Sequence, residues 1–149
     1  MSAFTGRDVS VEFAIGLEAA APASLTFKDF GMVRTKDFKV TWNTADTTAD
    51  KSPEFTRTNL VTFKSVEFSG DGVSYTDAIY NQSELEAHVC SPSAATNNQP
   101  KVWLRITFPD AVFTGPFIIS EWKKGAAYDD AATFSFTAKS NGAVTRTPV

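Results

Sequence analysis

The chain has 149 residues, a formal net charge of −3, one cysteine and one histidine. This length fits a single domain with its own core, so we expect one domain over residues 1–149. One Cys and one His exclude an intrachain disulfide and the roughly four Cys or His ligands of a structural zinc site. We expect neither a metal nor a cofactor, and the mild acidity argues against sequence-specific DNA reading, which needs clustered Lys and Arg.

Phenylalanine and threonine stand out in the composition, with 13 Phe and 18 Thr. Both residue types favour strands, which predicts a mainly β fold. No apolar run approaches the roughly 18–20 residues that cross a bilayer. The first residues also lack the basic and apolar parts of a secretory signal. We therefore expect synthesis in a reducing cytoplasm and no membrane partner.

Strand patterns fill the first part of the chain, at residues 11–17, 25–30 and 33–42. The third strand alternates with a period of two, so its large apolar side chains share one face. Its other face is entirely polar and carries Thr35, Asp37, Lys39 and Thr41. An antiparallel sheet can bury one face and wet the other, so this polar face either meets plain solvent or lines a water-filled channel.

A polar segment of 16 residues follows at 43–58, with Phe55 as its one large apolar side chain. Loops longer than about 12–15 residues are uncommon in compact domains and are usually functional or disordered. Either this loop stays mobile or a partner orders it, and Phe55 is then the natural anchor. A strand at 60–68, closed by a turn at 70–72, completes a hairpin around the loop, and its mixed parity predicts a bulge near Lys64 or Ser65.

The only helical pattern covers residues 76–90, with the helix itself expected at about 77–89. One face would carry Ala78, Gln82, Leu85 and Val89. Thr76 is a candidate N-cap, and a capping box at 83–86 offers a later start.

The last strands are expected at 102–108, 112–122, 133–139 and 143–147. Gly115-Pro116 interrupts the second of them, because a proline in a strand indicates an edge or a bulge. Asn141-Gly142 predicts a tight hairpin turn between the last two strands, since both residues tolerate positive φ.

Catalytic signatures are weak throughout the sequence. His88 has no evident nucleophile or orienting carboxylate, and Cys90 is read as a small apolar residue. Asp129-Asp130 has too few oxygen ligands for calcium and is read as a solvated turn. We therefore do not expect an enzyme.

Three segments, taken in order, resemble a known family. They are the strand–loop–strand unit from Asp37 to Phe68, the stretch Asp77-Ala-Ile-Tyr-Asn-Gln-Ser-Glu-Leu-Glu-Ala, and the ending from Thr133 to Pro148. This order resembles the major tail (tail tube) proteins of long, non-contractile-tailed bacteriophages. The ending resembles that family most, with its Thr- and Phe-rich strand, Ser-Asn-Gly turn and last strand.

The resemblance implies two packed antiparallel sheets, sandwich- or barrel-like, flanked by one α-helix and carrying a long polar hairpin loop. It implies a virion tail protein, made in the host cytoplasm, that forms hexameric rings stacked into a tube for DNA ejection. Four strands of each subunit would build the inner barrel. The implied partners are further copies of the chain, the tape-measure, tail tip and tail terminator proteins, and DNA in transient, non-specific passage.

Two sets of residues gain expected roles from this resemblance. The loop would bridge subunits and rings through Asn43, Thr44, Asp46, Asp50, Lys51, Pro53, Glu54, Phe55 and Arg57. The channel would be lined by Asp37, Lys39, Thr41, Ser65, Glu67, Ser135, Thr137 and Lys139. A lining that lets DNA pass should be mixed or acidic, so Lys39 and Lys139 depart from the most acidic expectation.

An alternative from another functional class stays open. Trp103, Trp122 and nearby tyrosines would then form a β-sandwich binding module that recognises carbohydrate or another virion protein.

Overall fold

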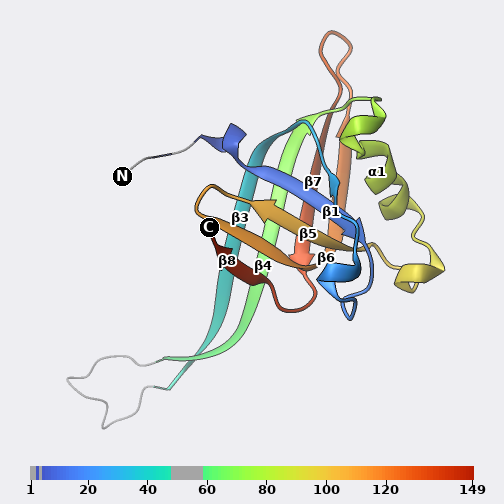
Figure 1. Ribbon diagram of the computed structural model, residues 1–149. Coiled ribbons are helices and arrows are strands. Elements are labelled where there is room, and N and C mark those ends of the chain that lie inside the picture. Colours follow the sequence, from blue (N-terminus) through green and yellow to red (C-terminus); the bar gives the residue numbers. More distant parts are fainter. Residues whose placement is uncertain (1–2, 4, 48–58) are drawn as a thin grey trace.

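The computed structural model describes residues 3, 5–47 and 59–149, and it is mainly β (Figure 1). Within these residues the chain forms eight antiparallel strands and one α-helix. The strands are β1 (Ser10–Ile15), β2 (Lys28–Asp29), β3 (Val33–Asp46), β4 (Asn59–Val73), β5 (Lys101–Thr107), β6 (Ala111–Gly125), β7 (Thr133–Ser140) and β8 (Thr145–Pro148). The helix is α1 (Gln82–Cys90), and short 3₁₀ helices lie at Gly6–Asp8, Pro22–Ser24, Ala78–Tyr80 and Ala94–Thr96. No helix of the described part has the length and apolar character needed to cross a membrane.

Strand β6 joins the two packed layers expected from the sequence. The strand order is β2-β1-β5-β6-β7-β4-β3, with β8 also on β6, so one hydrogen-bonded sheet contains both layers. The N-terminal part of β6 pairs with β5, and its part from Phe117 to Gly125 pairs with β7. The β1–β5 layer crosses over the β7–β4–β3 layer (Figure 1). The mainly β class and the flanking helix are thus confirmed, and the sheet does not close into a barrel.

An aromatic cluster fills the space between the two layers. Phe30 lies at its centre, with ring centroids 6.0 Å from Phe13 and 5.4 Å from both Phe134 and Phe136. Trp122 stacks on Phe134 at 5.5 Å. Because Phe13 belongs to one layer and Phe134 and Phe136 to the other, these contacts hold the layers together as well as removing apolar area from water.

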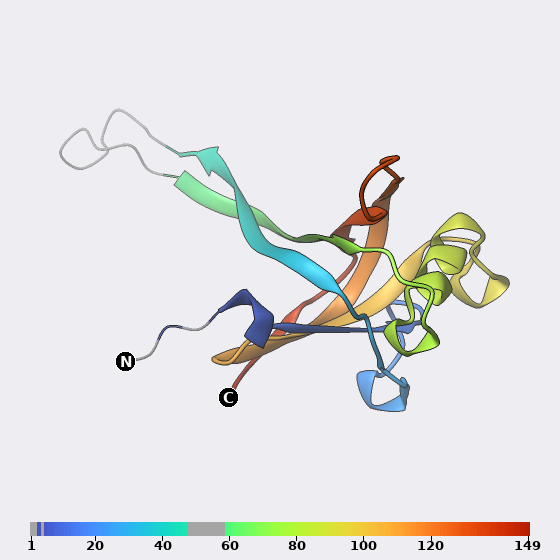
Figure 2. The same cartoon turned by 90° about the horizontal axis from the view of Figure 1, so that it is seen from above.

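The β3–β4 hairpin is longer than the sequence predicted. Beyond the last pair with β7, both strands continue away from the rest of the molecule (Figures 1 and 2). We call this two-stranded part, residues 40–46 of β3 and 59–66 of β4, the arm. The expected turn at 70–72 is wrong, because Gly70 and Gly72 lie inside β4, where they face Lys36 and Val33 of β3. A glycine inside a strand can mark a place where another backbone comes close, rather than a turn. The predicted bulge is present as a register shift, with Trp42 opposite Lys64 and the next pair displaced.

The helix begins later than Thr76, closer to the alternative start. Asn81 adopts a left-handed conformation with φ of 56°, which separates the 3₁₀ helix Ala78–Tyr80 from α1. Gln82 then begins α1, and its buried amide ties three backbone groups together. Its Oε1 accepts from the Tyr75 amide at 2.8 Å, and its Nε2 donates to the carbonyls of Gly31 and Val73 at 3.0 and 3.1 Å. This polar anchor, rather than an N-cap at Thr76, fixes where the helix starts.

The Asn141-Gly142 hairpin is also wrong. Strand β8 pairs with β6, not with β7, so both strands run along the same edge of β6 in the same direction. The break between them faces Pro116, whose carbonyl accepts from the Asn141 amide at 2.9 Å. Because proline has no amide hydrogen, Pro116 cannot donate a hydrogen bond back across this edge. The neighbouring strand is therefore interrupted between β7 and β8, while β6 itself continues.

Candidate assembly and channel surfaces

All eight channel candidates lie on one face of three adjacent strands, β3, β4 and β7. The register places Lys39 opposite Glu67, and Glu67 opposite Lys139. Residues directly opposite one another in an antiparallel pair point to the same face. The C-terminal part of β6 extends this face on the other side of β7. We call these four strands the four-strand sheet and their shared surface the polar face.

Side chains of the polar face form four transverse rows, running from the β6–β7 loop toward the arm. The first row contains Lys123, Ser135, Asp71 and Thr35. The second contains Glu121, Thr137, Ser69 and Asp37. The third contains Ile118, Lys139, Glu67 and Lys39. The fourth contains Ser65 and Thr41.

Six members of these rows were not among the channel candidates. Thr35 was placed on the polar side of its strand but not among them, and the other five are Ser69, Asp71, Ile118, Glu121 and Lys123. Ser69 and Asp71 were missed because residues 70–72 were interpreted as a turn. The alternation of Ser65 and Glu67 would have reached both had β4 been extended. Glu121 and Lys123 depend on the register of β6, which shifts between Ile119 and Glu121, so the sequence carried no direct signal for them.

The polar face and the core occupy opposite sides of the same strands. Phe68 and Ala138 are fully buried, whereas their neighbours Glu67 and Lys139 are half-buried and exposed. Burial alternates residue by residue in β4 from Val66 to Gly72 and in β7 from Phe134 to Ala138, which gives the middle of the four-strand sheet one dry and one wet side.

The arm exposes large apolar side chains. The exposed fraction is 54% for Trp42 and 74% for Phe63, and Val40, Leu60 and Val61 are also exposed. Lys64 lies over the Trp42 ring, 5.6 Å from its centroid, and covers only part of it. Apolar side chains gathered on a projecting element mark an interaction surface, because isolated proteins rarely expose such patches.

The predicted bridging loop overlaps this arm only in part. Asn43, Thr44 and Asp46 lie in β3, so the strand extends into what was expected to be loop. Six further residues of that prediction lie outside the described residues: Asp50, Lys51, Pro53, Glu54, Phe55 and Arg57.

Two strand edges of the four-strand sheet are free of strand partners in the described part of the chain. Strand β3 pairs with β4 on one side and ends the sheet on the other. Strand β6 pairs with β5 only as far as Ile118, so its C-terminal part has β7 on one side alone. Unpaired edges invite pairing with another chain unless they are covered.

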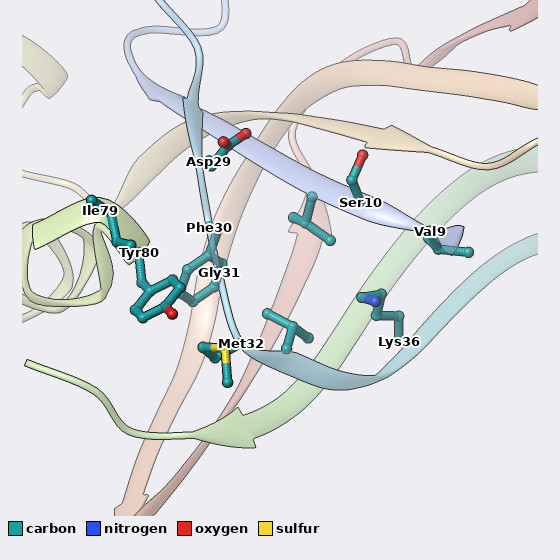
Figure 3. Close-up of a pocket in the computed structure, with 11 residues that line it drawn as sticks. Val9, Ser10, Asp29, Phe30, Gly31, Met32, Lys36, Ile79 and Tyr80 are labelled. Atoms are coloured by element: carbon teal, nitrogen blue, oxygen red, sulfur yellow. The ribbon is translucent and has the colours of Figure 1, made fainter. Parts of the chain in front are cut away.

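An open hollow of about 430 Å³ lies between β1 and the crossover into β3 (Figure 3). Lys36 and Val9 line one end of it, and Ile79 and Tyr80 line the other. The Lys36 ammonium donates to the Gly6 carbonyl at 3.0 Å, and burial lowers the pKa of Lys36. Lys36 alternates with Asp37 along β3, so this hollow lies on the side away from the polar face.

Within the described residues, the features expected of an enzyme or a glycan platform are not assembled. His88 is buried with its Nε2 2.9 Å from the Lys101 carbonyl, which is a structural contact. Trp103 is buried and donates through Nε1 to the Leu17 carbonyl at 2.8 Å, and Trp122 packs in the aromatic cluster. Neither tryptophan is free to stack on a sugar. Among the residues described, no group of three or more His, Cys, Asp or Glu is placed to hold a metal ion.

Comparisons with known proteins agree with this geometry. The sequence profile of a family described as phage tail tube protein matches residues 3–146. No curated protein matches the chain. Among solved structures, the tail of an empty gene transfer agent particle, obtained with C6 symmetry, is similar with a TM-score of 0.73 and 19% identity, covering 97% of this chain and 99% of that one. The native gene transfer agent virion gives a TM-score of 0.72 and 20% identity, with the same coverage.

The SPP1 tail tube is similar with a TM-score of 0.66 and 12% identity, covering 99% of this chain and 80% of that one. At these identities the structural matches establish the shared fold, and the profile establishes the family. The chain belongs to the phage tail tube protein family, and it is a structural component of the virion tail rather than an enzyme.

Proposed function

We propose that six copies of the chain close into a ring through the two free edges of the four-strand sheet, and that rings stack into the tail tube. Sixfold symmetry is that of the gene transfer agent tail, whose fold this chain shares. The observation that carries the proposal is the pair of unpaired edges at opposite sides of one alternating sheet.

Strand direction supports this closure. Four consecutive antiparallel strands leave β3 and β6 running in opposite directions. A rotation about the tube axis preserves strand direction, so β3 of one copy would meet β6 of the next as an antiparallel pair. Such a ring removes both free edges, as closed barrels do.

The polar face then lines the channel, and the core and α1 lie outside it. Leu85 of α1 is fully buried in the core, and Glu86 pairs with Lys124 at 3.0 Å. Lys124 alternates with Lys123 of the polar face, so the helix packs on the opposite side of β6. In this arrangement the sequence-predicted lining from Asp37 to Lys139 faces DNA in transit.

The arm would bridge neighbouring subunits and rings, where its apolar side chains lose contact with water. Each buried apolar side chain of this size contributes about 1.5–3 kcal/mol. The tape-measure, tail tip and tail terminator proteins remain the proposed partners of the tube. A solved tube-terminating cap of the anti-feeding prophage shares the fold, with a TM-score of 0.64 and 6% identity.

Thiol protection tests which face is inside. The native Cys90 is exposed on α1, and Thr137→Cys adds a second thiol on the polar face. Electron microscopy first establishes tubes in the wild type and in the variant. A bulky polyethylene-glycol maleimide should then modify both thiols in the dispersed chain, but only Cys90 in tubes. Labelling of the Thr137→Cys thiol together with protection of Cys90 in tubes would reverse the orientation, and a wild-type chain that never forms tubes would refute the function.

A further inference from the structure

The loop between β6 and β7, residues 126–132, projects from the end of the four-strand sheet opposite the arm (Figure 1). We call this loop the tip. At its base Gly125 pairs with Thr133, which in turn pairs with Val73, the last residue of β4. The arm contains the first residues of β4, so the tip and the arm extend the same strands in opposite directions.

The tip has the sequence Ala-Ala-Tyr-Asp-Asp-Ala-Ala and presents one large side chain. The Asp130 amide donates to the Ala127 carbonyl at 3.4 Å, which places Tyr128 and Asp129 at the centre of a turn. The Asp130 carboxylate accepts from the Ala131 amide at 2.8 Å and supports this turn. The Tyr128 side chain is fully exposed. One exposed tyrosine is ordinary on a protein surface, so its meaning depends on what the opposite end of the sheet presents.

One side of the arm presents apolar side chains beside a cation. Val40 and Trp42 alternate along β3, and Val61 shares their side because it is opposite Thr44, the next residue of that alternation. Each of these three apolar side chains is about half exposed. Lys64 is opposite Trp42, and its ammonium lies over the indole ring. The polar face uses the intervening residues of β3, so we call this other side the outer side of the arm.

Stacking of rings would bring the tip of one copy to the arm of another. Rings stacked in one direction meet head to tail, so one end of a subunit faces the opposite end of the next. The arm and the tip both extend the four-strand sheet, which places them at similar distances from the tube axis. The arm from Val66 to Asn59 spans seven residue steps, about 23 Å, so it can overlap the neighbouring ring. A subunit cannot make this contact with itself, because its arm and tip lie at opposite ends.

We propose that the tip of a subunit in one ring docks on the outer side of an arm from the next ring, with the Tyr128 ring against Trp42 and Asp129 facing Lys64. This inference rests on the proposed function and names the surface that the arm meets. Tyrosine and tryptophan are enriched among the residues that contribute most to interfaces, and aromatic pairs add to the burial of their area. The cation beside Trp42 and the carboxylates beside Tyr128 are complementary, which fixes the register of such a contact.

Charge exchange tests the pairing. Lys64→Glu and Asp129→Lys each remove the attraction, and Lys64→Glu/Asp129→Lys restores an opposite pair. The full-length variants are assembled under the conditions in which the wild type forms tubes, and pelleting gives the concentration of chain left unassembled. Each single variant should raise this concentration at least about fivefold, and the double variant should return to within about threefold of the wild type. Asp77→Lys is the control, because Asp77 is exposed and its side chain makes no capping hydrogen bond, and it should assemble as the wild type does.

The aromatic contact has its own test. Tyr128→Ser should raise the unassembled concentration at least about tenfold, as expected for loss of an aromatic anchor. Tyr128→Phe keeps the ring and should assemble as the wild type does. Ile79→Ser removes an exposed apolar side chain from neither end of the sheet and should also leave assembly unchanged. Circular dichroism of the dispersed chains should give one melting temperature for the wild type and both Tyr128 variants, which separates assembly from folding.

Tubes formed by Tyr128→Ser at the wild-type concentration would overturn the inference. A double charge variant that assembles no better than its weaker single parent would overturn it as well, because the two residues would then act independently. The wild type forms tubes in both cases, so failure of this pairing is distinct from failure of the proposed function. A wild type that forms no tubes would refute the proposed function, and this pairing with it.

Discussion

Gly72 occupies a position in β4 where an added methyl group has no space. A Cβ there would collide with the Met32 carbonyl oxygen, and it would lie 3.0 Å from both the Met32 carbonyl carbon and the Val33 Cα. These are backbone atoms, and they are held in place. Met32 has a φ of 64°, and its carbonyl accepts from the Val73 amide at 3.3 Å. Gly72→Ala must therefore displace the crossover into β3 or distort β4.

The expected cost follows from two opposing effects. Overpacking in a well-packed site costs about 1–3 kcal/mol, and a clash with backbone falls at the upper end. Replacing Gly by Ala also lowers the conformational entropy of the unfolded chain, which stabilises the folded state by about 0.4–1 kcal/mol. We expect Gly72→Ala to lower the free energy of unfolding by about 2 kcal/mol. At about 2–4 °C per kcal/mol for a chain of this size, the melting temperature should fall by roughly 4–8 °C.

Gly125→Ala is the matched control, because Gly125 ends β6 in the same sheet and its added Cβ would meet only the Thr133 Oγ1, at 3.6 Å. Thermal unfolding followed by circular dichroism should show this control unchanged or slightly stabilised. The reasoning would be refuted if Gly72→Ala melted at the wild-type temperature, or if both variants lost the same amount.

Two further perturbations address assembly and pH. Trp42→Asp on the arm should leave the monomer within about 0.5 kcal/mol of the wild type, because the side chain is 54% exposed, yet it should abolish tubes in electron micrographs. Ile79→Asp, at a still more exposed apolar residue off the arm, is its control, and tubes formed by Trp42→Asp would remove the arm from the mechanism. A backbone hydrogen bond, and after it the hydrogen bond from Lys101, lower the pKa of Glu18 in the folded chain. The ionised Glu18 carboxylate therefore stabilises the fold above its unfolded pKa of about 4.5, and this stabilisation is lost as the pH falls through the lower pKa of the folded state. Glu18→Gln should thus be less stable than the wild type at pH 7 and equal to it at about pH 2, and a difference that persists in acid would contradict this account.

The alternation of polar and apolar residues made much of the fold predictable. Period-two patterns predicted β1, β3, β5 and β7, together with the polar side of β3, because burial of one face constrains every second residue. The resemblance to tail tube proteins, together with this alternation, led to the expectation that Lys39, Glu67 and Lys139 share one surface, and the register places them on it. The channel role of this surface stays a prediction.

Errors arose where glycine and proline serve tertiary contacts rather than local turns. Gly72 permits close backbone approach inside a strand, and Asn141-Gly142 forms a break opposite Pro116 instead of a hairpin. The start of α1 at Gln82 depends on partners more than 50 residues away in the case of Gly31. These contacts cannot be read from the local sequence, because residue propensities describe one segment at a time and not the other elements that pack against it.

Strand β6 has a mechanical consequence for a tail built from this subunit. It belongs to both layers, so the four-strand sheet and the β1–β5 layer share one continuous backbone and cannot slide past each other. A bent tail would need to change shape without shearing its subunits. In the proposed tube, curvature would therefore be taken up at the joints between rings, where the arms reach across, while the bore within each ring keeps its diameter as DNA passes.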